Sequence, residues 1–365
     1  MSDPLVRVLA NPGILGSLSA RDWDLLARHA RQSDLLGRIA ELVFDHGLET
    51  SLPAGVRGHL DAERVLITAQ RATVTREVGH LEKALAPLGV PVVLLKGAAY
   101  LMAGLPAAAG RHFSDIDILL PRDALPAAES ALLLAGWVGT HHNDYDQHYY
   151  RVWMHELPPM QHMRRQTVLD VHHAILPLTA RLRPDSRLLL AAAKPLPGSA
   201  VMHTLGPIDM VLHSMTHLLH NEEFSHGLRD LSDLDLLLRH FGKDDHFWTE
   251  LPDRAAQLDL TRPLFYGLRY ARALLETPVP EATLVRTQGF GPPKAPLPLM
   301  DALWLRVLRS THPLADDAFG PAARFLLFLR AHWMRMPLPL LIRHLAHKCV
   351  TPKQSGERSN KTPDA

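Results

Sequence analysis

The sequence predicts an α+β protein in which a small mixed β-sheet with helices is flanked by helical regions on both sides. Apolar residues follow a helical period up to about residue 90. Short β-branched and apolar runs then occupy roughly residues 90–176, and helical periodicity returns from Asp209 onward. We therefore expect an N-terminal helical region over 1–89, a sheet core over 90–205, a C-terminal helical domain over 206–349 and a disordered polar tail over 350–365.

The composition is that of an ordinary globular protein. The 365 residues are 47% hydrophobic and 21% charged, which suffices for a sizeable core. The net charge of +1, with no basic stripe laced with aromatic residues, argues against binding of long nucleic acid. The single cysteine, Cys349, indicates a reducing compartment. There is no secretory signal and no apolar run of about 18 residues, so we expect a cytoplasmic protein without a membrane span.

The first region is expected to be helical throughout. Ser19 is suited to cap the helix "ARDWDLLARHARQ", with Asp22 as its capping-box partner. A long helix follows and ends at Gly89. Its apolar face is expected to comprise Leu60, Val65, Ala69, Val74, Val78, Leu81 and Leu85.

The sheet core begins with "VPVVLLKG", which indicates a buried strand entering a tight turn, and "AAYLMAGL" continues as a helix. "SDIDILLP" alternates strictly, as a strand does, and is followed by an amphipathic helix up to Gly136. Three further strand-like runs are "YYRVWMH", "PMQHMRR" and "QTVLDVHHAI". The helices expected after them cover 208–220, 228–241, 244–257, 262–275, 298–310, 320–334 and 338–348.

Two aspartates, Asp115 and Asp117, stand one residue apart in the alternating run. Residues two apart in a strand share a face, so both carboxylates project together while Ile116 and Ile118 face the core. Their charges repel unless a cation lies between them. Asp170 supplies a third carboxylate from another apolar strand. Three carboxylates on neighbouring strands predict a Mg²⁺ site, with two ions as in nucleotidyl transfer.

The first strand-to-helix turn is a candidate for holding phosphate groups. Gly97 lets the backbone approach a phosphate, and the N-terminus of the following helix offers free N–H groups. Lys96 and Arg111 flank the turn and are suited to neutralising phosphate charge. The alternatives are a lysine that extends to solvent and an arginine that pairs with Asp115 or Asp117.

The order of strand, "LKG", helix, "R…SDIDILL" and a later "LDVH" strand resembles the nucleotidyltransferase superfamily that includes DNA polymerase beta. More closely, it resembles a bacterial family of uncharacterised nucleotidyltransferases. The resemblance covers roughly residues 90–175 and continues through "LRDLSDLDLLL" to about residue 240. It implies a polymerase-beta-like nucleotidyltransferase core that uses an NTP, with Asp115, Asp117 and Asp170 as the catalytic metal ligands.

The resemblance also implies nucleotide-binding positions. Gly97 and Ala98 stand where the superfamily usually has Gly-Ser, so the loop hydroxyl is missing here. Arg229 and Asp233 are implied to face the nucleotide cleft; from their spacing alone they are equally a surface ion pair on one helix. His172, on the strand face of the third carboxylate, is a candidate metal ligand, orienting donor or substrate contact, or a buried structural histidine.

A histidine cluster complicates this interpretation. His213, His217, His220 and His226 have spacings that suit either zinc or a helix lining a cleft. We expect a Mg²⁺-dependent nucleotidyltransferase that moves an NMP from an NTP to a small molecule, a peptide or a protein. Two alternatives remain open: a catalytically silent nucleotide-binding regulatory protein of the same fold, and a metal phosphohydrolase that uses the histidine cluster.

Overall fold

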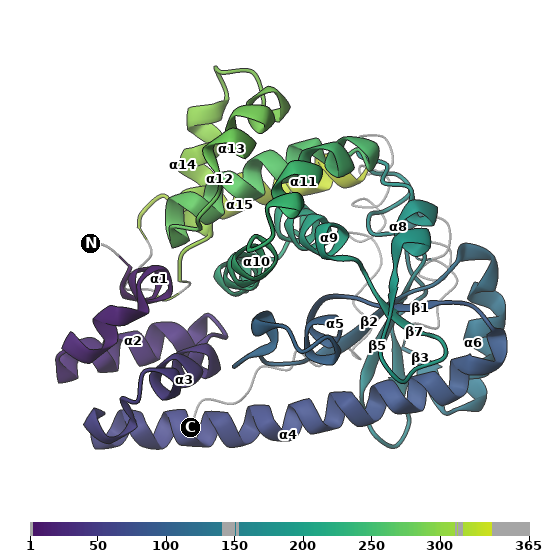
Figure 1. Ribbon diagram of the computed structural model, residues 1–365, viewed down its shortest axis with the longest axis horizontal. Coiled ribbons are helices and arrows are strands. Elements are labelled where there is room, and N and C mark those ends of the chain that lie inside the picture. Colours follow the sequence, from purple (N-terminus) through teal and green to yellow (C-terminus); the bar gives the residue numbers. More distant parts are fainter. Residues whose placement is uncertain (1–2, 141–149, 151–152, 311, 313–316, 338–365) are drawn as a thin grey trace, which may run out of the picture.

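The computed structural model describes residues 3–140, 150, 153–310, 312 and 317–337. The expected α+β architecture is confirmed, because a seven-stranded mixed sheet is flanked by helices from both ends of the chain. In Figure 1 the N-terminal helices and the sheet lie towards opposite ends of the long helix α4 (Ala54–Leu85), and C-terminal helices lie on the other side of the molecule. No described helix is long and apolar enough to cross a membrane.

The N-terminal helices form a small core of their own. They are α1 (Pro4–Ala10), α2 (Ala20–Gln32), α3 (Leu36–Asp45) and the first half of α4. The capping box is confirmed, since Ser19 accepts a hydrogen bond from the Asp22 N–H and the Asp22 carboxylate reaches back to the Ser19 N–H. Leu228 from the C-terminal region completes this core. The N-terminal helices are therefore packed against the region that contains Leu228.

The apolar face predicted for α4 is right at both ends and wrong in the middle. The residues confirmed as buried are Leu60, Val74, Val78, Leu81 and Leu85. Val65 is 71% exposed and Ala69 is also exposed, whereas Ile67 is buried. Helix α4 packs on α2 and α3 with its first half and on α5 and α6 with its second, so its buried stripe changes partners midway. Gly89 was expected to end this helix, but α4 ends at Leu85. A 3-10 turn over Ala86–Leu88 follows, and it is this turn that Gly89 caps, with a left-handed φ of 65°.

The sheet has the strand order β3-β4-β5-β2-β1-β7-β6. Its strands are β1 (Val92–Leu94), β2 (Asp115–Leu119), β3 (Trp137–Gly139), β4 (Met160–His162), β5 (Val168–His172), β6 (Lys194–Pro195) and β7 (Met202–Thr204). The pairs β2–β5 and β1–β7 are parallel and the other pairs are antiparallel. Expected strands at β1, β2, β4 and β5 are confirmed. The parallel pair at the centre brings the two aspartate-bearing strands side by side.

Other strands differ from the expectation. The run "YYRVWMH" lies partly outside the described residues, and its described residues form no strand. Just after it, Glu156 makes an isolated bridge to His172. Strands β3, β6 and β7 were not predicted. Each has two or three residues, too few for an alternating pattern to be visible in the sequence.

Helices α5 (Lys96–Met102), α6 (Leu125–Leu134) and α8 (Ser186–Ala192) accompany the sheet. The C-terminal helices are α9 (Pro207–His220), α10 (Gly227–Phe241), α11 (Asp245–Gln257), α12 (Thr261–Leu275), α13 (Glu281–Thr287), α14 (Leu297–Val307) and α15 (Gly320–Arg335). The expected helices in this range are confirmed, and α13 is additional. The helix expected over 338–348 and the tail over 350–365 lie outside the described residues.

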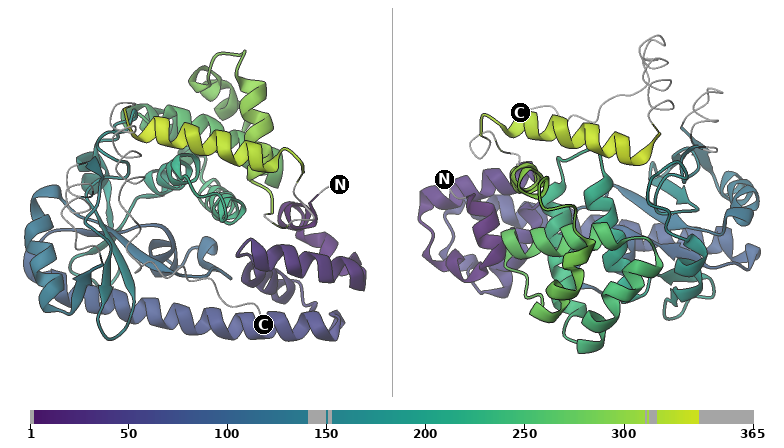
Figure 2. Two further views of the ribbon diagram at one scale, coloured as in Figure 1. Left: turned by 180° about the vertical axis from the view of Figure 1, so that it is seen from behind. Right: turned by 90° about the horizontal axis from the view of Figure 1, so that it is seen from above.

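One hydrophobic core runs through the sheet and the C-terminal helices. It joins Leu94 and Leu169 of the sheet to Leu212 of α9 and Leu234 of α10. Figure 2 shows α15, in yellow, along the outside of the C-terminal helices. Its Arg330 donates a hydrogen bond of 3.1 Å to the Leu219 carbonyl at the end of α9. The sheet therefore packs against α9 and α10 through one continuous core, and α15 is bonded to the outer side of α9.

Candidate functional site

The three predicted carboxylates come together on the parallel strand pair. In the β2–β5 register Asp117 lies directly opposite Asp170, and Asp115 precedes Asp117 by two residues on the same face. The ligand atoms of all three lie within 4.8 Å of one another. Ile116 and Ile118 point into the core, as the alternation predicts. We refer to Asp115, Asp117 and Asp170 as the carboxylate site.

The carboxylate site carries more negative charge than its surroundings balance. Burial, together with the charge of Asp117, raises the pKa of Asp170 to about 7. The Oδ1 atom of Asp170 is buried and has no hydrogen-bond partner in the described part of the chain. Burial also opposes ionisation of Asp117, but the Lys96 charge and the His172 hydrogen bond hold the pKa of Asp117 far below its usual range. The charge of Asp117 is thus neutralised by Lys96 and His172, whereas Asp170 is left without a counter-charge of its own.

This donor set fits Mg²⁺. Hard carboxylate oxygens are the ligands that Mg²⁺ prefers, and the orphaned Asp170 oxygen lacks the partner that a cation would provide. Both contacts to Asp117 are made by its Oδ1, from Lys96 at 2.8 Å and from His172 at 3.0 Å. The Oδ2 atom carries neither contact. All three side chains therefore keep a carboxylate oxygen with which to hold a divalent cation.

Lys96 lies on the carboxylate site itself. It is the first residue of α5, directly after β1, and its φ of 47° is left-handed, which is uncommon for a residue with a side chain. Its ammonium group donates to Asp117, and although burial lowers the pKa of Lys96, the charges of Asp117 and Asp115 raise it above its usual range. The lysine is thus a fixed positive charge beside the three aspartates.

Gly97 and Ala98 are buried in the first turn of α5. A Cβ on Gly97 would lie 2.4 Å from a guanidinium nitrogen of Arg111, so this glycine makes room for the arginine. Arg111 does not form the ion pair with Asp115 or Asp117 that was one of the alternatives from the sequence. Its Nε donates to Asp233 at 2.8 Å. The structure thus gives Gly97 a packing role next to the carboxylate site.

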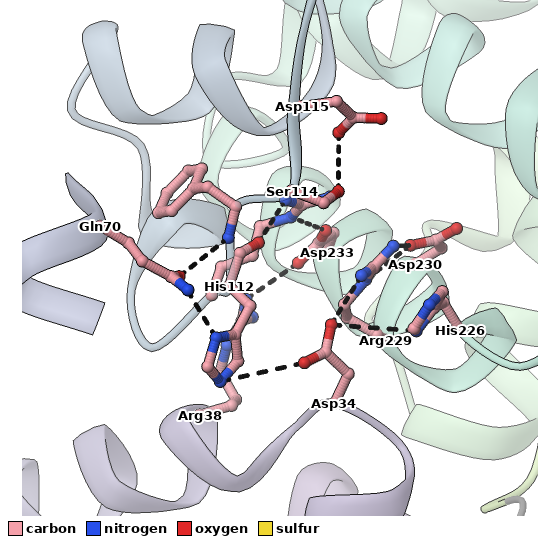
Figure 3. Close-up of polar contacts among 12 residues, drawn as sticks. Asp34, Arg38, Gln70, His112, Ser114, Asp115, His226, Arg229, Asp230 and Asp233 are labelled. Carbon is pink, nitrogen blue, oxygen red and sulfur yellow. Dashed lines mark hydrogen bonds and ion pairs between the residues drawn. The ribbon is translucent and has the colours of Figure 1, made fainter. Parts of the chain in front are cut away.

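Asp233 is the centre of a buried network that joins three parts of the chain. It accepts hydrogen bonds from Arg111 and, at 2.9 Å, from Arg38 of α3. The ion pair between Arg229 and Asp233 that their spacing suggested is not formed. Instead, Arg229 donates hydrogen bonds to Asp34 at 2.7 Å and to Asp230 at 2.9 Å (Figure 3). We call these six residues the arginine–aspartate network: Arg38, Arg111, Arg229, Asp34, Asp230 and Asp233.

A short link connects the network to α4. His112, which follows Arg111, contacts Glu63 of α4. Figure 3 shows its contacts with Gln70 of α4 and with Asp34, which lies 3.9 Å from the His112 Nε2. The hydrogen bond to Glu63 outweighs partial burial and raises the pKa of His112. Next along the chain, the Ser114 hydroxyl donates to Asp115 at 2.8 Å. Through Arg111 and His112, the segment before β2 is therefore held against α10 and α4.

His172 bridges two carboxylates at the end of β5. Its Nε2 hydrogen-bonds Asp117 and its Nδ1 lies 3.1 Å from Glu156 Oε2. Burial lowers the pKa of His172, but these two carboxylates together raise it to about 10. The histidine contacts Asp117, and we find no hydrogen bond from it to Asp170. Glu156 and its neighbour His155, whose pKa burial lowers to about 3, were not anticipated from the sequence.

The predicted histidine cluster does not form a metal site among the described residues. Two groups of ligand atoms lie close enough there to hold a metal, the carboxylate site and the group of His155, Glu156 and His172. His220 uses Nδ1 on the Thr216 carbonyl at 3.1 Å, and His217 lies 3.6 Å from Asp230. Helix α9 thus lines the polar interior, and burial is the largest cause of the lowered pKa values of its histidines.

Comparison with known proteins gives a family. A family model described as "Uncharacterised nucleotidyltransferase" matches residues 19–276, from the cap of α2 to the end of α12. No curated protein and no solved structure matches the chain. The matched range includes the sheet, the carboxylate site and the whole arginine–aspartate network, and it spans well over half of the sequence. The chain belongs to this family of uncharacterised nucleotidyltransferases.

Proposed function

We propose that the protein is a Mg²⁺-dependent nucleotidyltransferase that moves an NMP from an NTP to an acceptor hydroxyl or phosphate. The observation that carries this proposal is the parallel register of β2 and β5, which gathers Asp115, Asp117 and Asp170 around a buried, unpartnered carboxylate oxygen. Family membership is consistent with it. The acceptor is a small molecule, a peptide or a protein, and long nucleic acid is the least suitable because the net charge is only +1.

The carboxylate site would hold Mg²⁺, with two ions as the expected number. Bound there, the metal supplies charge neutralisation and orientation of the phosphate oxygens. Asp115 and Asp117 would hold the metal from β2, and Asp170 would hold it from β5. We also assign to Asp170 the uptake of the proton from the acceptor. In the transfer, the acceptor oxygen forms a bond to the α-phosphorus and the bond to pyrophosphate breaks.

The residues around the turn after β1 are proposed to bind the triphosphate. The first-turn N–H groups of α5, at Gly97 and Ala98, provide donors, and Lys96 provides a positive charge. Arg111 and Arg229 are each neutralised by aspartates in the present structure. Because of these ion pairs, we assign to both arginines a role in holding the structure around the site rather than in binding phosphate directly.

A second candidate is a catalytically silent nucleotide-binding protein of the same fold. One feature that favours it is the pairing of Lys96 with Asp117, which already neutralises one of the proposed metal ligands. The absence of a hydroxyl at Ala98 points the same way. Such a protein would bind NTP at the same site without releasing pyrophosphate.

Isothermal titration of the four NTPs in the presence and absence of Mg²⁺ tests the proposal. We expect one NTP to bind in a Mg²⁺-dependent manner to the wild type and to the control Asp123→Ala, whose carboxylate is exposed. Binding should disappear in the double variant Asp115→Ala/Asp117→Ala. Release of pyrophosphate from the bound NTP, in the presence of a small-molecule extract, distinguishes the enzyme from the silent protein. If no NTP binds to the wild type, both forms of the proposal are wrong.

A further inference from the structure

A second group of possible metal ligands lies beside the carboxylate site, and it has a different donor chemistry. It consists of His155, Glu156 and His172, whose ligand atoms lie within 4.8 Å of one another. Two imidazoles and one carboxylate are unsuited to Mg²⁺, which takes oxygen ligands, and suited to Zn²⁺ and similar transition-metal ions. Three protein ligands with an open position are also the pattern of zinc sites in enzymes.

Two buried imidazole nitrogens in this group lack hydrogen bonds. Nδ1 of His155 and Nδ1 of His172 are both inaccessible to solvent, and neither has a hydrogen-bond partner within the described ranges. The second of these atoms lies 3.1 Å from Glu156 Oε2 without the alignment of a hydrogen bond. Buried polar atoms are almost always paired, so these two nitrogens without hydrogen bonds, on residues whose ligand atoms lie close to Glu156, indicate a missing partner. A cation shared by all three would satisfy them.

The backbone holds the group in place. Leu157 N–H donates to the Val171 carbonyl and His173 N–H donates to the His155 carbonyl, each at 2.8 Å. These bonds flank the bridge between Glu156 and His172. The rings of His155 and His172 are stacked, with centroids 5.2 Å apart. The ligands therefore come from two strand-like segments whose register is fixed before any metal arrives.

We propose that His155, Glu156 and His172 bind one Zn²⁺ ion, separate from the Mg²⁺ of the carboxylate site. His172 would use Nδ1 for the metal and keep its Nε2–H on Asp117, 3.0 Å away. A histidine that binds a metal with one nitrogen and donates to a carboxylate with the other is a common arrangement, in which the carboxylate fixes the ring. Here the metal would also fix the orientation of Asp117. The zinc site does not depend on whether the protein transfers nucleotides.

The alternative is a purely ionic bridge, in which a protonated His172 links Glu156 to Asp117 and no metal binds. This arrangement accounts for the carboxylates but leaves the buried Nδ1 of His155 without a partner. The two descriptions differ in a measurable way, because only the metal site requires His155.

The test is a titration of metal-free protein with Zn²⁺ against a competing chromophoric chelator, in excess Mg²⁺, and with Co²⁺ as a spectroscopic probe. We expect one equivalent to bind to the wild type, with the visible absorption of Co²⁺ bound to nitrogen ligands. His155→Ala should weaken binding by about 100-fold or more, since it removes one of three ligands. The control His203→Gln, in the same sheet but outside the group, should bind as the wild type does. Asp115→Asn should also retain the site, which separates this result from any effect on NTP binding.

Glu156→Gln, which has nearly the same shape, provides a second removal of a ligand. Circular dichroism and thermal unfolding show whether each variant is folded, and Zn²⁺ should raise the melting temperature of the wild type but not of Glu156→Gln. If the wild type binds no equivalent of Zn²⁺ in excess Mg²⁺, or if folded His155→Ala or Glu156→Gln binds it as tightly as the wild type, the proposal is wrong and the ionic bridge is the better description.

Discussion

The carboxylate site and the arginine–aspartate network both bury several charged side chains, but they balance these charges differently. In the network each aspartate bonds an arginine, and each arginine bonds an aspartate. At the carboxylate site the counter-charges are Lys96 and His172, and Asp170 keeps an unpartnered oxygen. Removal of one partner from the balanced network should destabilise the fold, whereas the unbalanced group agrees with our proposal of a bound cation. Burial alone does not distinguish the two; the partner of each carboxylate does.

The two regions also differ in what they connect. The network ties Arg38 of α3, Arg111 of the loop before β2 and Asp233 of α10, so it fixes the N-terminal helices and the C-terminal helices to the core. The carboxylate site involves neighbouring strands of one sheet. Substitutions in the network should therefore act on stability, and substitutions in the carboxylate site should act on ligand binding.

The largest expected effect on stability is that of Asp233→Ala. It leaves Arg38, whose side chain is 4% exposed, and Arg111 buried without their shared carboxylate. Removing one member of a buried ion pair typically costs about 3–5 kcal/mol of unfolding free energy. Urea unfolding measures this loss of unfolding free energy. The control is Asp253→Ala, because Asp253 pairs with Arg286 at the surface. That substitution should lower the unfolding free energy by less than about 1 kcal/mol. Equal losses in the two variants would contradict the role of the network.

Gly97→Ala should have an intermediate effect. The added methyl group would lie 2.4 Å from a guanidinium nitrogen, so Arg111 must move away from its position on Asp233. Overpacking of this kind costs about 1–3 kcal/mol. The matched control is Gly79→Ala in α4, where a Cβ meets nothing within 4 Å and alanine favours the helix. Urea unfolding measures the stability of both variants. If Gly97→Ala is as stable as the wild type, Arg111 can accommodate the methyl group and the predicted overpacking is wrong.

Asp170→Asn should have the opposite sign. The raised pKa of about 7 means that ionised Asp170 destabilises the folded protein above neutral pH, because the unfolded state ionises near 3.8. Removal of this charge should raise the unfolding free energy at pH 8, and it should raise it less at pH 4, where the carboxyl group is protonated in the folded protein. The same variant should lose the stabilisation that Mg²⁺ gives the wild type in thermal unfolding. A loss of stability with retained Mg²⁺ response would contradict the contrast between the two regions.

The smallest expected effect concerns the pH dependence at His112. Its pKa is raised, chiefly by the hydrogen bond to Glu63, so its stabilising contribution is present below about 6.5 and is lost as pH rises through the raised folded value. The residue is partly exposed, so the contribution should stay below about 1 kcal/mol. Unfolding free energies at pH 6 and pH 8.5 should differ less in His112→Gln than in the wild type. An unchanged pH dependence would mean that the histidine is not charged in the folded protein.

Much of the carboxylate site was predictable because its signal is local. The alternation in "SDIDILL" and the apolar strand around Asp170 define which side chains share a face, and short strands of the same sheet then bring them together. Strands β6 and β7 were missed because so few residues carry no periodicity. The buried face predicted for the middle of α4 was wrong, because Ile67 rather than Val65 is buried there.

The network could not be predicted from sequence, because its partners are far apart along the chain. Arg38 and Asp233 are separated by 195 positions, and nothing near either residue indicates the other. The spacing of Arg229 and Asp233 suggested a helical pair, but each residue has a partner from another part of the fold. The same holds for Glu156, which is brought to His172 by a bridge rather than by a regular strand.

The most direct test of the central claim is a crystal structure of the protein with Mn²⁺ in place of Mg²⁺ and with the NTP that binds best. Anomalous scattering from Mn²⁺ locates the ion independently of any assumption about the ligands. We predict a peak in coordination contact with carboxylate oxygens of Asp115, Asp117 and Asp170, next to the triphosphate and the first turn of α5. Bound NTP with no Mn²⁺ peak at these three aspartates would contradict the claim that this unbalanced group is the metal site.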